Sequence, residues 1–329
     1  MLILAGDIGG TKTDLLLAKV DHRGVAHERR SARFISADSP DLITLLDRFL
    51  GDARPQAAAF GIAGPVIDGR CHTTNLPWLI EQGPLAEALG LDPSRLSLHN
   101  DFHALALSID ELPKSARSVL QIGDPEATGV RAILGAGTGL GEAIVVPTGE
   151  GPRVIAGEGG HADFAPRDPL EQQLLAHLLQ RHEHVSYERL LSGPGIVAIY
   201  EFLVAEGLAP PSPRILARST HEDPAALIGE LALAGTDRTC VQTIDRFLMI
   251  YGAEAGNLAL KVLPRGGLFI AGGIALRLLP LLLRPPFIEA FSAKGRMRPL
   301  LKKIPVSVVI EARAGLIGAL RTACKLLPK

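Results

Sequence analysis

The N-terminal stretch LILAGDIGGTKTDLLLAKV, residues 2–20, holds the pattern that decides the fold of this chain. Two apolar runs flank a corner rich in glycine, which predicts a β-hairpin made of residues 2–6 and 14–20. A hairpin that only reverses the chain needs two turn residues such as Asn-Gly. Here the corner also carries Asp7 and Thr11. These extra polar residues indicate that the tip of the hairpin binds a ligand.

The same plan occurs a second time, in RAILGAGTGLGEAIVVP at residues 131–147. Free backbone N–H groups in a glycine-rich corner let phosphate oxygens approach closely, and a threonine adds a hydroxyl donor. Neither corner has the G-x-x-x-x-G-K-[ST] spacing of a P-loop, and the second continues into a strand instead of the helix that a Rossmann fingerprint requires. Together with a third glycine pair at 272–273, the repeat predicts two similar α/β domains that face each other across a cleft.

The rest of the chain has the pattern of a mixed α/β protein. The segment RLSLHNDFHALALSI, 95–109, predicts a strand, a turn and a helix. Helical spacing dominates the later part of the chain. The segment SYERLLSGPGIVAIYEFLVAEG, 186–207, is predicted as two helices broken at its Ser-Gly-Pro-Gly. A helix within 167–182 should begin at Asp168 as N-cap, with Glu171 completing a capping box.

The composition narrows the class of function. The chain is 47% hydrophobic and 21% charged, as globular proteins are. Its net charge is −1 and it has no basic block, which argues against a nucleic-acid partner. The three cysteines are far apart, so neither a zinc ribbon nor a disulfide framework is predicted, and a reducing cytosol is expected. The longest apolar stretch, 266–283, contains glycines, an arginine and a proline, so neither a membrane helix nor a membrane partner is expected.

Three carboxylates have both a structural and a chemical interpretation. Asp101 follows Asn100 at the start of an apolar helix, which is ordinary helix-cap chemistry, but its carboxylate could also accept a proton from a reacting hydroxyl. Glu188 lies in the first turn after a serine, where acids are common because they complement the helix dipole. Asp7 ends a buried apolar run, where an unpaired charge would be costly. The residues alone leave these alternatives open.

The motifs taken together resemble those of bacterial ATP-dependent glucokinases, in the hexokinase–actin–chaperone ATPase superfamily. The matching motifs are GDIGGTKTDLLL, GIAGPV, TTNLPW, NDFHALA, LGAGTGLGEA, GEGGHADFAP, VSYERLLSGPGI, GNLAL and FIAGGI. They occur in family order and span nearly the whole chain. The related repressor–ORF–kinase sugar kinases usually have a cysteine-rich zinc motif after the E-x-G-H region, and this sequence has none. One departure is Lys12, which stands where close relatives are expected to have asparagine.

This resemblance implies a two-domain α/β fold of the hexokinase and actin type, ribonuclease H-like, with a cleft between the domains. The small domain would comprise residues 1–110 and 312–329, and the large domain 111–311. The implied reaction transfers the γ-phosphoryl group of ATP, with Mg²⁺, to the 6-hydroxyl of glucose, the first step of glycolysis. A cytoplasmic homodimer is expected. The alternatives are a kinase for another hexose or an amino sugar, and a non-catalytic sugar sensor; a strand that starts at Leu2 leaves no room for the DNA-binding extension of related repressors.

The resemblance also implies roles for single residues. Asp101 would be the catalytic base, and Asp7 would hold Mg²⁺ through water. The residues implied for sugar binding are Asn75, Asn100, Asp101, Glu158, His161 and Glu188. Those implied for ATP binding are Gly6, Asp7, Ile8, Gly9, Gly10, Thr11, Gly137, Thr138, Gly272 and Gly273.

Overall fold

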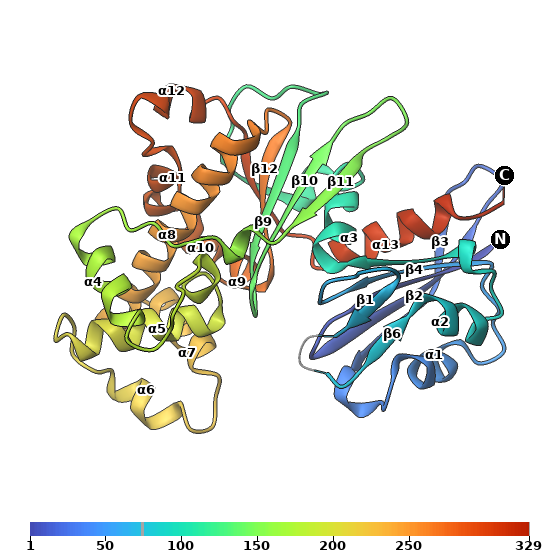
Figure 1. Ribbon diagram of the computed structural model, residues 1–329, viewed down its shortest axis with the longest axis horizontal. Helices are drawn as coiled ribbons and strands as arrows, with labels where there is room; N and C mark the ends of the chain where they lie inside the picture. The colour runs from blue at the N-terminus through green and yellow to red at the C-terminus, as the bar shows by residue number, and fades with distance from the viewer. Residues whose placement is uncertain (74–75, 329) are drawn as a thin grey trace. The chain divides into compact units, whose positions relative to one another are not determined.

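The computed structural model describes residues 1–73 and 76–328, and the chain divides into two compact units (Figure 1). Unit 1 comprises Met1–Ala116, Val154–Ala156 and Glu311–Lys329. Unit 2 comprises Arg117–Arg153 and Gly157–Ile310. Each unit contains its own sheet.

The sheet of unit 1 has the strand order β3-β2-β1-β4-β7. The hairpin predicted at the N-terminus is its first half: β1 (Leu2–Ile8) and β2 (Lys12–Val20) pair antiparallel, and β3 (Ala26–Ile35) extends them. On its other side β1 pairs in parallel with β4 (Ala57–Ile62), which in turn pairs in parallel with β7 (Leu96–Asn100). The sheet is therefore mixed, and the ends of β1, β4 and β7 lie at one edge.

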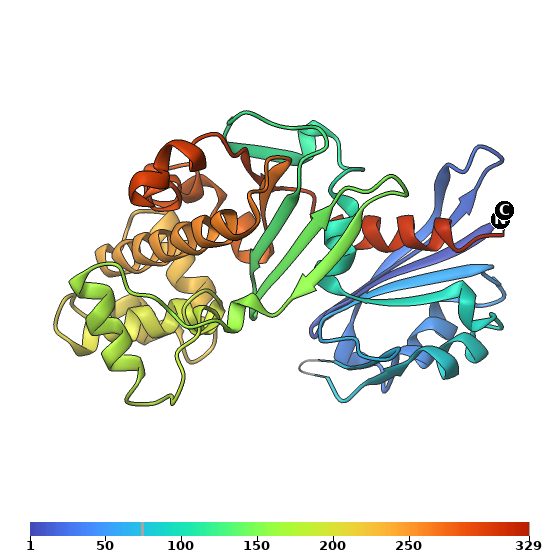
Figure 2. The ribbon, with the colours of Figure 1, turned by 45° about the horizontal axis from the view of Figure 1, so that its top comes forward.

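Helices cover both faces of this sheet (Figure 2). Alternate residues of β1 point to opposite faces, and each face has its own apolar cluster. One cluster joins the sheet to α1 (Leu42–Leu50) and α2 (Gln82–Ala88), and the other joins it to α13 (Ala314–Lys325). The last helix packs closely on α3 (Asp101–Ser108), and the missing side chain of Gly318 makes this possible. A Cβ at Gly318 would collide with the carbonyl of Ala104. A separate two-stranded sheet is formed by β5 (Arg70–His72) and β6 (Leu79–Glu81).

The second sheet has the order β11-β10-β9-β12-β13-β8, and all its residues belong to unit 2 except Val154–Ala156 of β11. This sheet is also mixed, because β9 pairs antiparallel with β10 and parallel with β12. The second glycine corner of the sequence lies between β9 and β10. The strands are β8 (Arg117–Gln121), β9 (Arg131–Ala136), β10 (Leu140–Val146), β11 (Arg153–Gly157), β12 (Gly267–Ala271) and β13 (Val306–Val309).

Unit 2 also has a large helical part, built around α8 (Arg238–Val262). Its glycines let α11 (Pro285–Ser292) approach, because Cβ atoms at Gly252 and Gly256 would collide with carbonyl oxygens of that helix. The other helices are α4 (Pro169–Leu178), α5 (Gly193–Ala205), α6 (Pro213–Arg218), α7 (Pro224–Leu233), α9 (Gly273–Arg277), α10 (Leu279–Leu282) and α12 (Arg298–Leu301). Single 3₁₀ turns are η1 (Ser36–Asp38), η2 (Pro93–Arg95), η3 (Lys114–Ala116), η4 (Gly159–His161), η5 (Tyr187–Arg189) and η6 (Gly295–Met297).

Two local predictions were wrong. The segment 186–207 contains only one α-helix, because Ser192 caps α5 by accepting a hydrogen bond from the Gly195 N–H at 3.1 Å; what precedes it is the single turn η5. The capping box at α4 is incomplete. Asp168 accepts from the Glu171 N–H at 2.8 Å as predicted, but the Glu171 carboxylate accepts from the Arg167 N–H, one residue before the cap. Ion pairs of Glu171 with Arg167 and Arg246 hold it in that position.

Candidate active site

The first glycine corner is a closed turn pinned to the end of β3. The Gly9 N–H donates to the Lys12 carbonyl at 2.9 Å, so this donor is used within the turn. The Ser36 hydroxyl donates to the Gly9 carbonyl at 2.8 Å, and the Ser36 N–H donates to the Thr11 carbonyl. Thr11 and Lys12 are exposed at the tip. The corner is therefore fixed from behind, and its outer end is open to a ligand.

Gly6 and Ile8 belong to the core beneath this corner. A Cβ at Gly6 would lie 2.5 Å from the Phe60 ring, and Ile8 is fully buried. Their side-chain positions serve packing, whereas the half-buried side chain of Asp7 lies on the other face of the strand.

Asp7 and Asp101 are brought together at the edge where β1 and β7 end. A Cβ added to Gly61 on β4 would lie 3.6 Å from the Asp101 Cα and 4.0 Å from the Asp7 Oδ1. Asp7 and Asp101 therefore both lie next to Gly61. Burial, followed by the charges of Asp101 and Asp14, raises the pKa of Asp7 to about 7. Two carboxylates thus converge beside the glycine corner.

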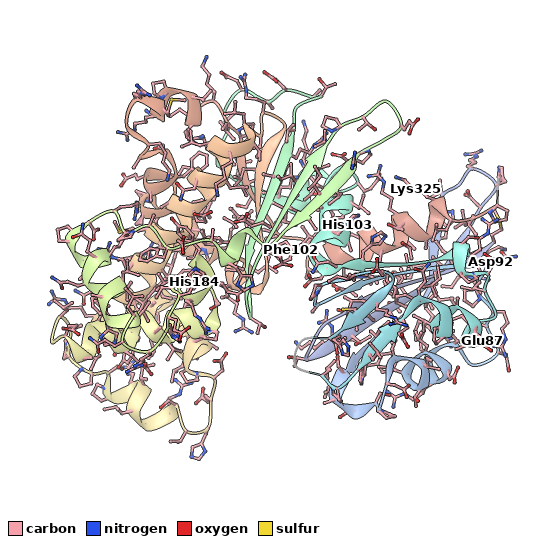
Figure 3. The ribbon with its side chains drawn as sticks, viewed as in Figure 1. Glu87, Asp92, Phe102, His103, His184 and Lys325 are labelled. Carbon is pink, nitrogen blue, oxygen red and sulfur yellow. The ribbon has the colours of Figure 1, made fainter. Side chains whose placement is uncertain are left out.

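The turn from β7 into α3 positions Asn100 and Asp101. Asn100 is the N-cap: its Oδ1 accepts from the Phe102 N–H at 2.9 Å, and its Nδ2 donates to the Gly64 carbonyl at 3.1 Å. Asp101 is the first residue of the helix, just before Phe102 and His103 (Figure 3), and its Oδ1 also accepts from the Phe102 N–H. The capping role therefore falls mainly on Asn100, and the Asp101 carboxylate lies in the favourable field of the helix N-terminus.

Unit 2 gathers the other polar residues predicted for the sugar. His161 on η4 has its Nε2 3.9 Å from a Glu158 carboxylate oxygen and 3.9 Å from the Glu188 Oε1 on η5. The Glu188 Oε2 accepts from the Leu140 N–H at 2.9 Å, which anchors this side chain at the start of β10. All three side chains keep exposed surface. They form a cluster of two acids around one imidazole that can accept from and donate to hydroxyl groups.

The other two glycine corners also lie in unit 2. The Gly137 N–H donates to the Gly139 carbonyl at 2.8 Å, and the Gly137 carbonyl accepts from the Gly193 N–H at 2.9 Å, so the corner rests on the start of α5. Gly272, with a φ of 92°, lies against β9, because a Cβ there would be 2.5 Å from the Ala136 carbonyl. A Cβ at Gly273 would meet open space. Only Gly272 is therefore required by the fold itself, and Gly273 leaves room beside it.

Comparisons with known proteins agree with one another. The sequence profile of the glucokinase family matches residues 4–325. Glucokinase from Trichormus variabilis is 46% identical, covering 99% of this chain and 99% of the relative. This chain belongs to the glucokinase family. A crystal structure of glucokinase from an Antarctic psychrotroph is 34% identical, covers 98% of each chain and gives a TM-score of 0.82. A ROK family glucokinase from Streptomyces griseus, solved with glucose and AMPPNP, is 21% identical, covers 99% of this chain and 100% of the other at a TM-score of 0.67, and shares the fold.

Membership in the glucokinase family confirms the predicted fold class and enzyme class. The fold is a two-domain α/β fold with two mixed sheets, and the activity of the family is ATP-dependent phosphoryl transfer. Of the residues predicted for the site, Asn75 lies outside the described part of the chain. Within residues 1–73 and 76–328, no helix is both long and apolar enough to span a membrane.

The resemblance implies a nucleotide with Mg²⁺, and the Asp7 carboxylate at the first corner fits that ion. The described residues contain no group of three or more His, Cys, Asp or Glu side chains that could hold a metal by themselves. Mg²⁺ needs less, because it usually keeps several waters and takes one or two carboxylates together with phosphate oxygens. Asp7 would supply an oxygen ligand, and burial, followed by the charges of Asp101 and Asp14, raises the pKa of this carboxyl group. A cation bound there would favour its ionised form.

Two residues near this site were not predicted from the sequence. A Cβ at Gly315, in the first turn of α13, would lie 2.7 Å from the Asp7 Oδ2, and Gly61 lies between Asp7 and Asp101. Both occur in ordinary apolar segments, which carry no mark of a distant carboxylate. Only the packing of α13 and β4 around β1 places them there.

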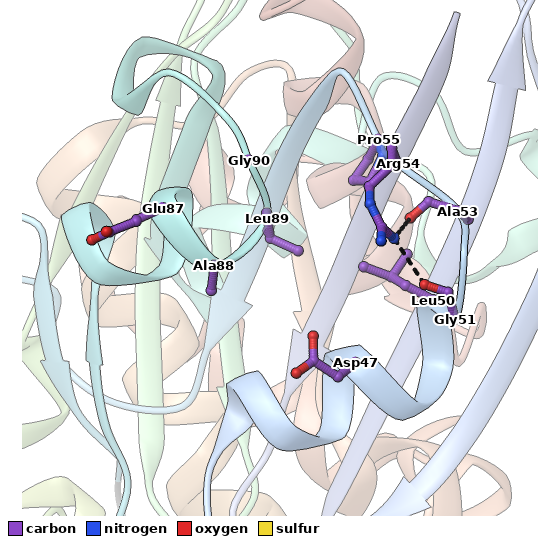
Figure 4. Close-up of a pocket in the computed structure, with 10 residues that line it drawn as sticks. All are labelled: Asp47, Leu50, Gly51, Ala53, Arg54, Pro55, Glu87, Ala88, Leu89 and Gly90. Carbon is purple, nitrogen blue, oxygen red and sulfur yellow. Dashed lines mark hydrogen bonds between the residues drawn. The ribbon is translucent and has the colours of Figure 1, made fainter.

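A hollow of about 430 Å³ lies elsewhere in unit 1, between the C-terminal ends of α1 and α2 (Figure 4). Its wall includes Asp47, Glu87 and Arg54, and the Arg54 guanidinium donates to the Gly51 carbonyl at 2.8 Å. None of the residues predicted for sugar or ATP lines it. Its concave shape therefore does not mark the chemistry of this glucokinase family member.

Proposed function

We propose that this chain transfers the γ-phosphoryl group of ATP to the 6-hydroxyl of glucose, giving glucose 6-phosphate and ADP. The observation that carries the proposal is the convergence of Asp7 and Asp101 at the edge of a sheet whose adjacent corner is rich in glycine. The membership in the glucokinase family supports the sugar and the nucleotide. The Streptomyces griseus relative was solved with both glucose and AMPPNP.

Asp101 is the proposed catalytic base. The 6-hydroxyl oxygen attacks the γ-phosphorus, the bond to the β-phosphate oxygen breaks, and the hydroxyl proton passes to the Asp101 carboxylate. The N-terminal field of α3 favours the ionised carboxylate, so Asp101 is ready to accept a proton at neutral pH. Asn100, held in place by its two hydrogen bonds, contacts the sugar from the same turn.

The glycine corners are assigned to ATP. Gly9, Gly10 and Thr11 line the exposed tip of unit 1, and Gly137 and Thr138 form the corner of unit 2 at β10. Gly272 and Gly273 complete the nucleotide site next to that second corner. Asp7 would hold Mg²⁺ through water, and the ion when bound neutralises charge on the phosphates.

The sugar is assigned to the polar residues that the family resemblance implies. Glu158, His161 and Glu188 would bind its hydroxyls together with Asn100, and with Asn75 as a further contact. The domains proposed are residues 1–110 with 312–329 and residues 111–311, and the division of the structure near residues 116 and 310 supports them. We also infer a cytoplasmic homodimer, which the three free cysteines favour for the compartment.

The assignment of Asp101 is tested by Asp101→Ala. Phosphorylation should be abolished while glucose affinity stays within about tenfold, because the lost interaction belongs to the transition state. Asp92→Ala is the control, since this exposed carboxylate of unit 1 only caps η2 through Ser94. Turnover near the wild-type rate in Asp101→Ala would leave Asp101 as a residue of the helix start only.

The sugar and the donor are tested by a coupled assay over a panel of hexoses and amino sugars, with ATP, ADP and polyphosphate as donors. The highest kcat/KM is expected for glucose with ATP. A preference of tenfold or more for another hexose would favour the alternative sugar kinase, and turnover of no sugar at all would favour a sensor.

A further inference from the structure

Two buried glutamates of unit 2 lie behind the proposed sugar cluster. Glu142 on β10 is 8% exposed and Glu254 on α8 is 1% exposed. In each, the Oε1 atom is buried and has no hydrogen-bond partner within the described part of the chain. Ionised carboxylates in that condition are costly, and native proteins leave few buried polar atoms unpaired. The pair therefore needs an explanation that packing alone does not give.

Glu142 directly underlies the turn that carries Glu158 and His161. A Cβ at Gly159 would collide with the Glu142 carboxylate, and a Cβ at Gly160 would collide with the Leu140 carbonyl. The turn η4 thus rests on β10, and the Glu142 carboxyl group is the surface on which Gly159 lies. The position of that carboxyl group therefore sets how closely the turn next to Glu158 approaches β10.

Glu254 is connected to the second turn of the cluster. Its Oε2 accepts from the Asn257 Nδ2 at 2.8 Å, and the same amide nitrogen donates to the Tyr187 hydroxyl at 2.9 Å. Tyr187 precedes Glu188, and its N–H donates to the Ala162 carbonyl at 3.0 Å, which joins η5 to the residue after His161. The two buried acids therefore lie beneath both turns that carry the proposed sugar ligands.

Burial and the neighbouring charge of Glu254 both favour the neutral form of Glu142. Burial, and then the charge of Glu254, raises the pKa of Glu142 to about 7, against a smaller opposing effect of Lys261. Burial also raises the pKa of Glu254, opposed by the Asn257 hydrogen bond and by the charges of Lys261 and Lys294. With a proton on Glu142, the two carboxyl groups no longer repel each other.

We propose that Glu142 is a positioning residue for sugar binding, whose buried carboxyl group supports the Gly159–His161 turn and so holds Glu158 and His161 next to Glu188. This inference rests on the proposed sugar-binding role of those three residues. It assigns Glu142 no contact with the sugar and no part in proton transfer.

The first test compares Glu142→Gln with Glu142→Ala. The neutral, isosteric glutamine should keep the wild-type KM for glucose within about twofold. Alanine removes the support and should raise that KM five- to tenfold, with kcat changed less than threefold because Asp101 is untouched. Glu171→Ala is the matched control, since Glu171 is a fully buried glutamate of the same unit whose partners are Arg167 and Arg246. It should lower the melting temperature without changing KM.

The second test uses the collision at Gly159. Gly159→Ala alone should raise KM at least tenfold, because the new methyl group displaces the turn from Glu142. In the double variant Glu142→Ala/Gly159→Ala the methyl group has room, so KM should fall back at least threefold relative to Gly159→Ala. A double variant that is no better than Gly159→Ala, or a Glu142→Gln variant as poor as Glu142→Ala, would overturn the proposal.

Glu188→Gln separates this inference from the proposed sugar site itself. If Glu188→Gln raises KM for glucose and folded Glu142→Ala does not, only the positioning role fails. If Glu188→Gln leaves glucose affinity unchanged, the sugar cluster is wrongly assigned, whatever Glu142 does. Should Glu142→Ala not fold, Glu142→Gln and the Gly159→Ala pair still decide the question.

Discussion

At the scale of single residues, small side chains decide where the charged ones can lie. Asp7 can approach Asp101 because β4 has a glycine, Gly61, at that point of the sheet, and α13 can reach Asp7 because its first turn has Gly315. A Cβ at Gly315 would occupy the space of the Asp7 carboxylate, and a Cβ at Gly61 would collide with the Cβ of Ala104 on α3. The reactive edge of unit 1 is therefore shaped by residues that have no chemistry of their own.

Gly315→Ala should lower kcat at least tenfold while the protein stays folded. The added methyl group would lie 2.7 Å from the Asp7 Oδ2, so the carboxylate must move. The substitution also favours the helix by about 1 kcal/mol, which offsets part of the strain. Steady-state kinetics with ATP and a thermal melt measure the two effects. Gly83→Ala on α2 is the control, because its Cβ would meet open space; equal kinetics in the two variants would contradict the expectation.

Glu188→Gln should weaken glucose binding more than it slows turnover. In the variant the amide oxygen can still accept the hydrogen bond that the Leu140 N–H donates to the Glu188 Oε2. The negative charge next to His161 is lost. A hydrogen bond to a charged group contributes about 1.5–3 kcal/mol, so KM should rise by about tenfold or more. Initial rates over a range of glucose concentrations give this value. An unchanged KM with a low kcat would argue against a role in binding the ground state.

At the scale of elements, the start of α4 at Asp168 was predicted correctly, and two further helices of unit 2 begin in the same way. Asp168, Asp223 and Asp237 each cap a helix of unit 2 by accepting from a backbone N–H, and a Pro follows the first two. These residues satisfy donors that have no partner inside the helix. The error at the capping box has a physical cause: Glu171 is fully buried, and ion pairs with two arginines outweigh one hydrogen bond to the cap.

Asp168→Ala should destabilise unit 2 by about 2 kcal/mol, more than Asp223→Ala at about 1 kcal/mol. Both substitutions remove a cap, but Asp168 also forms an ion pair with the Arg246 guanidinium at 2.6 Å. Within the described residues, Asp223 accepts from the Ala225 N–H and forms no ion pair. Urea unfolding followed by circular dichroism compares the two variants at the same pH. Equal losses of stability would show that the Arg246 contact contributes little.

At the scale of the whole molecule, stability should depend on pH through a pair of stacked histidines. His99 on β7 and His103 on α3 have ring centroids 4.5 Å apart. Burial and then the charge of His103 lower the pKa of His99 from 6.5 to about 4, and burial lowers that of His103. At these two histidines, the unfolded chain therefore binds protons more readily than the folded chain below pH 6.5.

The contribution of His99 to the free energy of unfolding should fall as the pH decreases from about 6.5 to about 4, by up to about 3 kcal/mol, whereas the raised pKa values of Asp7 and Glu142 act in the opposite direction. Trp78, the one tryptophan of the sequence, is buried in unit 1 and reports its unfolding by fluorescence. His99→Gln should remove part of this dependence, whereas the exposed His22 should leave it unchanged when replaced by glutamine. A His99→Gln variant whose stability changes with pH between 6.5 and 5 as the wild type does would contradict the expectation.

The sequence by itself determined the fold class, the N-terminal hairpin, the helix starts at Asn100 and Asp168, and the family. These follow from local patterns, since apolar periodicity, caps and glycine corners act over a few residues. The first corner was identified in this way, and so was the turn that carries Asn100 and Asp101. Glycine-rich corners look alike in sequence whether or not they bind phosphate. For that reason the ligand could be predicted only from the whole set of family motifs.

Only the tertiary structure decided which side chains meet. The pairing of β1 with β4 puts Asp7 beside Asp101, although 94 residues separate them. The packing of α13 brings Gly315 to the Asp7 carboxylate, and the packing of α8 behind β10 puts Glu254 beneath the same turns as Glu142. A single sequence carries no trace of such contacts, because their energy depends on distances that arise after the chain has folded. The proposed chemistry of this protein rests on those contacts, and its architecture rests on the local patterns.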